Sequence, residues 1–64
     1  MITTFDLRGG YRVTAFPVSD GGVIFETQNA DGEVISTVTR KGPEARSLLA
    51  SLSMISKGVG HGAA

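Results

Sequence analysis

The stretch GGVIFETQNADGEVISTVTR, residues 21–40, decides the fold of this chain. Two runs rich in Val, Ile, Thr and Phe flank the pair Asp31-Gly32, and such a pair between β-forming runs is the strongest short-range signal of a β-hairpin. With Asp31-Gly32 as a two-residue loop, Phe25 pairs with Val38. The stretch therefore predicts two antiparallel strands, and the rest of the chain is placed relative to them.

Two further strands are predicted before this hairpin. In residues 3–8, Thr3, Phe5 and Leu7 alternate with more polar neighbours, which is the period of a short strand, and residues 11–18 are rich in β-forming residues. Gly9-Gly10 and residues 19–22 supply the turns, because glycine adopts the positive φ that tight turns require. Pairing through two-residue loops predicts that one face carries Thr3, Phe5, Leu7, Phe16, Val18, Val23, Phe25, Val34 and Val38.

The segment after the hairpin has the features of a helix. Gly42-Pro43-Glu44 suits its start, with glycine at the cap, proline at the first helical position and a carboxylate near the positive end of the helix dipole. A helix over residues 43–56 is expected, ending at Lys57-Gly58 with the glycine in the left-handed conformation. Its apolar stripe has the i, i+3, i+4, i+7 spacing of one helix face and consists of Ala45, Leu48, Leu49, Leu52 and Ile55.

These elements predict an α+β fold class: a four-stranded antiparallel β-meander followed by one C-terminal α-helix packed on one sheet face (ββββα). Residues 1–59 are expected to form a single domain, because the chain is short and its sequence shows no internal domain boundary. Residues 60–64 have few side chains that can pack, so they are expected to form a flexible C-terminal tail.

The chain of 64 residues has six basic and six acidic side chains, a formal net charge of zero, and no cysteine. Zero net charge disfavours partners bound through long-range attraction, such as nucleic acids and membranes. No stretch approaches the roughly 18 apolar residues of a membrane span, and the N-terminus does not resemble a signal peptide. We therefore expect a cytoplasmic protein. Its core must be small and has no disulfide, which favours oligomerisation as additional support.

No constellation of catalytic or metal-binding residues is present. His61 is the only histidine, and it stands in the glycine-rich tail without an acid or nucleophile at a useful spacing. Residues 29–32 are similar to part of a calcium loop, but the downstream glutamate of such a loop is missing. We expect no catalytic residues, no metal and no cofactor, and hence a protein that is not an enzyme.

Two surfaces are unusual for a monomer. The predicted second face of the sheet is about half apolar, where a single antiparallel sheet normally shows polar side chains to water. The outer side of the helix has one charged residue and many small ones. Both features favour a homodimer or a protein partner, through the helix, the second face or an edge strand. The candidate partner or dimer surface consists of Tyr11, Val13, Ile24, Ile35 and Met54.

A rival interpretation is single-stranded nucleic-acid binding, in which cationic side chains hold phosphates and an aromatic ring stacks on a base. The candidate contacts are Arg8, Tyr11, Arg12, Arg40 and Lys41. The order of four strands and a helix resembles that of the transcriptional positive-cofactor family, whose dimers bind single-stranded DNA, and this resemblance implies a DNA-binding dimer. In a meander, however, Arg8 and Arg12 lie at the opposite end of the sheet from Arg40 and Lys41.

The function expected from the sequence is that of a small non-enzymatic interaction module that binds another macromolecule as a homodimer. Small chains without catalytic residues occur as inhibitors or accessory proteins of the phage or mobile-element type, and this chain fits that description. The alternative is the single-stranded nucleic-acid-binding protein described above.

Overall fold

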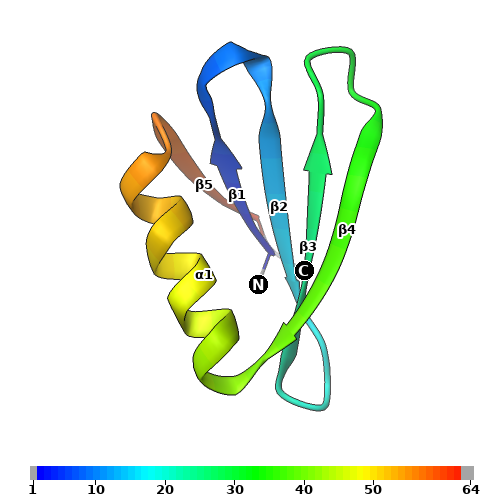
Figure 1. Cartoon of the computed structure of the whole chain (residues 1–64), viewed down its shortest axis with the longest axis vertical. Coiled ribbons are helices and arrows are strands. Elements are labelled where there is room, and N and C mark those ends of the chain that lie inside the picture. Colours follow the sequence, from blue (N-terminus) through cyan, green and yellow to red (C-terminus); the bar gives the residue numbers. More distant parts are fainter. Residues whose placement is uncertain (1, 63–64) are drawn as a thin grey trace.

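The computed structural model describes residues 2–62 as one sheet with one helix across it (Figure 1). The elements are β1 (Ile2–Asp6), a 3-10 turn η1 (Arg8–Gly10), β2 (Arg12–Pro17), β3 (Gly22–Gln28), β4 (Val34–Lys41), α1 (Gly42–Ile55) and β5 (Gly58–Gly62). The sheet is antiparallel and five-stranded, in the order β4-β3-β2-β1-β5. The helix α1 leaves edge strand β4 and leads into edge strand β5 on the far side of the sheet.

The fold class predicted from the sequence is confirmed: four antiparallel strands precede a single helix in one small domain. The helix begins one residue before its predicted start, with Pro43 in its first turn and Lys41 at the N-cap. Its end differs from the prediction. Ser56 is the C-cap in an extended conformation, and Gly58 begins a strand instead of adopting a left-handed conformation.

The fifth strand corrects the prediction of a flexible tail. Residues 60–62 are not frayed but belong to β5, which pairs antiparallel with β1 along its whole length, from Ile2 opposite Gly62 to Asp6 opposite Gly58. The Lys57 N–H donates to the Asp6 carbonyl oxygen at 2.9 Å and leads the chain into this pairing. Residues 63 and 64 of the predicted tail lie outside the described residues.

The two turns before β3 each contain three residues instead of two. The Leu7 N–H donates to the Tyr11 carbonyl oxygen at 2.8 Å, and the Val18 N–H donates to the Gly22 carbonyl oxygen at 3.0 Å. In the second turn Gly21 has a φ of 85°, the left-handed conformation that closes a three-residue hairpin loop. Each additional loop residue shifts the strand pairing by one position, which reverses the faces of the strand that follows.

The face of β2 that packs in the core is therefore the opposite of the one predicted. Phe5 pairs with Val13, and Ala15 pairs with Phe25. As a result Val13 and Ala15 are buried, with 6% and 3% of their surface exposed. Their predicted place on the second face was wrong, and so was the inward placement of Phe16, which lies half-buried on the outer face. The extra residue in each of the two turns shifts the pairing by one position. These two shifts cancel between β1 and β3, so β1 keeps the face that was predicted for it.

The loop between β3 and β4 also has three residues, because the Asn29 N–H donates to the Glu33 carbonyl oxygen at 2.9 Å. The predicted pair of Phe25 with Val38 nevertheless forms. A β-bulge in β4 compensates for the longer loop and preserves the register beyond it.

This bulge moves Val34 off the core face. Thr27 pairs with Ser36 and Gln28 pairs with Val34, which leaves Ile35 as the additional residue. Val34 is consequently on the same face as Gln28 and is 51% exposed, so its predicted place in the core was wrong.

The core lies between α1 and one face of the sheet. Its buried members are Phe5, Val13, Ala15, Phe25 and Leu52, against which Leu7, Val23, Leu48 and Leu49 pack. Ala45 of the predicted helical stripe is also buried. Ile55 departs from the prediction, with 62% of its surface exposed, because it is the last residue of the helix before the chain turns into β5.

Candidate interaction surface

The edge strand β4 is exposed along almost its whole length. Of its eight residues, only Val38 is partly buried; all others are exposed. Val34 and Ile35 are large apolar residues with 51% and 55% of their surface open to solvent. Within residues 2–62 no strand pairs with the outer side of β4, and no helix lies beyond it in Figure 1. A long edge of β-branched residues is a template for pairing with another chain.

The alternation of an antiparallel ladder identifies which backbone groups of β4 face this open edge. The Gly22 carbonyl oxygen accepts its 3.0 Å hydrogen bond from the chain just after β2. The even-numbered residues of β3 therefore face β2, and the odd-numbered ones face β4. Because Phe25 pairs with Val38, the neighbouring Thr37 and Thr39 direct their N–H and C=O groups outward.

The two ends of this edge have opposite charges. Glu33 directly precedes β4, and Arg40 lies near its other end. The Arg40 Nη1 donates to the outward Thr39 carbonyl oxygen at 2.9 Å. Neither Glu33 nor Arg40 forms an ion pair within the described part of the chain, whereas Lys41 Nζ lies 2.9 Å from Asp20 Oδ2. The hydrogen bond from Lys41 lowers the pKa of Asp20.

The outer face of the sheet presents a smaller apolar area. Phe16 pairs with Ile24, which in turn pairs with Thr39 of β4. Both apolar side chains are half-buried, although α1 packs on the other face. This row leads across the sheet to the open edge, so a chain bound at β4 would extend an apolar surface that already exists.

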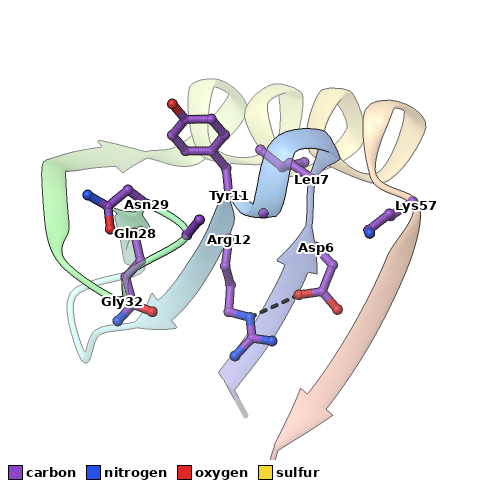
Figure 2. A pocket seen from close by; sticks show the side chains of 10 residues that line it. Asp6, Leu7, Tyr11, Arg12, Gln28, Asn29, Gly32 and Lys57 are labelled. Carbon is purple, nitrogen blue, oxygen red and sulfur yellow. Dashed lines mark hydrogen bonds and ion pairs between the residues drawn. The ribbon is translucent and has the colours of Figure 1, made fainter.

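A polar pocket lies at the end of the sheet opposite Arg40 and Lys41, between the loops of the β1–β2 and β3–β4 hairpins (Figure 2). The consecutive residues Tyr11 and Arg12 point in opposite directions there, and the Arg12 Nε lies 2.9 Å from Asp6 Oδ1. Lys57 also lines the pocket and has no ion-pair partner among the described residues. The pocket combines an aromatic ring with two cations, one of them neutralised by Asp6.

The structure does not gather the predicted partner surface into one area. Tyr11, Ile35 and Met54 are exposed and Ile24 is half-buried, but Val13 is in the core. The four accessible residues come from the position just before β2, from β3, from the β4 bulge and from α1, which covers the other face of the sheet. The open edge, which includes Ile35, is the continuous surface among them.

The predicted nucleic-acid contacts are divided as expected. Arg8, Tyr11 and Arg12 are at one end of the sheet, where Arg12 pairs with Gln28, and Arg40 and Lys41 are at the other, where Lys41 pairs with Gly22. Sequence reasoning missed Lys57, which joins the first group only because β5 pairs with β1. No local sequence signal reports that pairing.

Residues 2–62 contain no group of three or more His, Cys, Asp or Glu side chains placed to hold a metal ion. None of the helices formed by these residues has the length and apolar character needed to span a membrane. No protein-family model, curated protein or solved structure matches this chain, so its function is inferred from its own geometry.

Proposed function

We propose that this protein is a small non-enzymatic interaction module that binds another polypeptide by strand addition at the edge of β4. The observation that carries the proposal is the open edge itself, with seven of its eight residues exposed. In strand addition, main-chain hydrogen bonds provide affinity and alternate side chains provide specificity. The outward N–H and C=O groups of Thr37 and Thr39 are the donors and acceptors for such a strand.

The exposed side chains of β4 also fit this role. Val34 and Ile35 are β-branched residues that pack well against a neighbouring strand. Proline, which protects many edges from pairing, is absent from β4, and its only charged residues are Arg40 and Lys41 at its end. Inhibitors and accessory proteins of the phage or mobile-element type are the class of module that we propose on grounds of size.

Affinity capture from an extract of the native host tests this proposal. Thr37→Pro removes an N–H that faces the open edge, but it leaves every hydrogen bond between β4 and β3 in place. It should therefore block strand addition while the domain stays folded. Met54→Ser, on the exposed side of α1, is the matched control. We expect a partner that the wild type and Met54→Ser retain and Thr37→Pro loses, with circular dichroism confirming that each variant is folded. Capture that is insensitive to Thr37→Pro would contradict the proposal.

The polar pocket favours single-stranded nucleic-acid binding as a second candidate function. Tyr11 is 44% exposed and available for stacking, and Lys57 is free to contact a phosphate. A labelled oligonucleotide titrated at two salt concentrations tests it, because binding through phosphates weakens steeply with salt. Lys57→Ala should weaken binding, and Arg46→Ala on α1 should not. Absence of binding at low salt would exclude this candidate.

A further inference from the structure

We propose that the polypeptide bound at the β4 edge is a second copy of this protein, and that the two β4 strands pair antiparallel around a two-fold axis at Thr37. This inference rests on the proposed function and names its partner. Three features of the edge support it: the faces of its residues, its outward backbone groups and two charges, Glu33 and Arg40, that have no ion-pair partner among the described residues.

A two-fold axis between antiparallel edge strands is perpendicular to the sheet, so each residue can pair only with one that points to the same face. In the regular part of β4, Val38 shares the core face with Phe25, its partner in β3. Ser36 and Arg40 share that face by alternation, and Thr37 and Thr39 lie on the outer face. An axis between two positions would pair neighbouring residues, which point to opposite faces. The axis must therefore pass through a residue, which then pairs with its own copy.

Past the bulge, the faces shift by one position. Val34 pairs with Gln28 and so lies on the outer face, and Glu33, opposite Asn29, lies on the core face. The bulged Ile35 is left out of the pairing. An axis at Thr37 then matches Thr37 with its own copy, and each further pair also joins two residues of one face: Ser36 with Val38, Val34 with Thr39, and Glu33 with Arg40.

The charges select this register over its neighbour. With the axis at Val38, Arg40 would lie opposite Ser36, and Glu33 would lie beyond the end of the partner strand, opposite Gly42. Both charges would then stay unpaired. With the axis at Thr37, Glu33 and Arg40 face each other twice in the dimer, and opposite charges directly across a strand pair are stabilising.

The contacts within one chain leave Glu33 and Arg40 able to pair with each other across the dimer. Lys41 does not compete for Glu33, because its Nζ is held 2.9 Å from Asp20 Oδ2. The Arg40 guanidinium meanwhile bonds the Thr39 carbonyl oxygen of its own strand. Thr39 is one of the residues that would bond the second copy, so dimerisation releases Arg40 where Glu33 of that copy lies.

Cysteine cross-linking tests the register, since the chain contains no cysteine of its own. A residue on the axis meets its own copy, and the Cα separation of about 5.5 Å in a hydrogen-bonded pair suits a disulfide. Thr37→Cys should form a cross-linked dimer under mild oxidation, and Val38→Cys, the matched control, should not. Cross-linking of Val38→Cys but not Thr37→Cys would overturn the register.

Charge exchange tests the ion pair and the dimer. Light scattering at high micromolar concentration should show a wild-type dimer, a loss of at least tenfold in dimer affinity for Glu33→Arg and for Arg40→Glu, and recovery in the double variant. Arg46→Glu on α1 should leave the dimer unchanged. A monomeric wild type would overturn the inference, and the proposed function would stand separately if Thr37→Pro still abolished capture of a host partner.

Discussion

Gly10 and Ala30 bring the two hairpin loops at one end of the sheet into direct contact: a Cβ at position 10 would lie 2.8 Å from the Ala30 Cβ. Gly10 also has a φ of 82°, which side chains disfavour. The β1–β2 turn is thus restricted both by its own backbone and by the β3–β4 loop.

We expect Gly10→Ala to destabilise the domain more than Gly21→Ala. Both replace a glycine of positive φ, at a cost of about 1–2 kcal/mol each, but position 21 faces open space. The contact with Ala30 should add about 1–3 kcal/mol of overpacking at position 10. Chemical denaturation of both variants measures the difference. The added variant Ala30→Gly should recover part of the loss in Gly10→Ala, and no recovery would contradict the contact.

Leu52 and Met54 provide a contrast within one helix. Leu52 is 7% exposed and packs in the core, whereas Met54 is 86% exposed. Leu52→Ala should cost about 2–5 kcal/mol of unfolding free energy, as should Phe25→Ala, because each leaves a cavity. Met54→Ala should change stability by less than about 0.5 kcal/mol. Similar melting temperatures for Leu52→Ala and Met54→Ala would contradict this core.

The Asp20–Lys41 ion pair predicts an acid-sensitive contribution to stability. The hydrogen bond from Lys41, with a second from the Gly22 N–H at 3.1 Å, lowers the pKa of Asp20. The contribution is therefore present above the ordinary aspartate pKa of about 3.9 and is lost as the pH falls through the lower folded value. In Lys41→Met, carboxyl NMR titration should show a higher pKa of Asp20. An unchanged value would show that Lys41 is not the main cause.

Removal of β5 should weaken the opposite edge of the sheet. A chain that ends at Lys57 loses the strand that pairs with β1, and with it backbone hydrogen bonds worth about 0.5–1.5 kcal/mol each. We expect a lower melting temperature and faster hydrogen exchange of β1 amides. His61→Ala keeps the backbone of β5 and is the control. Unchanged exchange in the truncated chain would contradict the role of β5.

The sequence predicted the order of strands and helix, the β3–β4 pairing and most of the helical stripe, because hydrophobic periodicity and glycine turns report these directly. Loop length is not encoded as clearly. Asp31-Gly32 and Gly9-Gly10 suit two-residue loops, yet each belongs to a three-residue loop, and one added residue was enough to turn Val13 and Ala15 inward.

The candidate surface depended on those same register details. Ile35 was correctly placed at the surface, but its place in a bulge follows from the loop length and the core packing together. The strand β5 was missed because Gly58-Val59-Gly60-His61-Gly62 has little strand propensity and acquires its conformation from the free edge of β1. The sheet has β4 at one edge, as the predicted meander implied, but its other edge is β5 and not β1.

The pairing of Ile2 with Gly62 has a practical consequence for how this protein can be handled. Both ends of the described chain leave the sheet from adjacent strands at one corner, and β2 and β3 separate that corner from β4. A purification tag, a fluorescent reporter or a fused domain attached at either end would therefore start on the far side of the sheet from the open edge. Such attachments leave β4 accessible to whatever chain it binds.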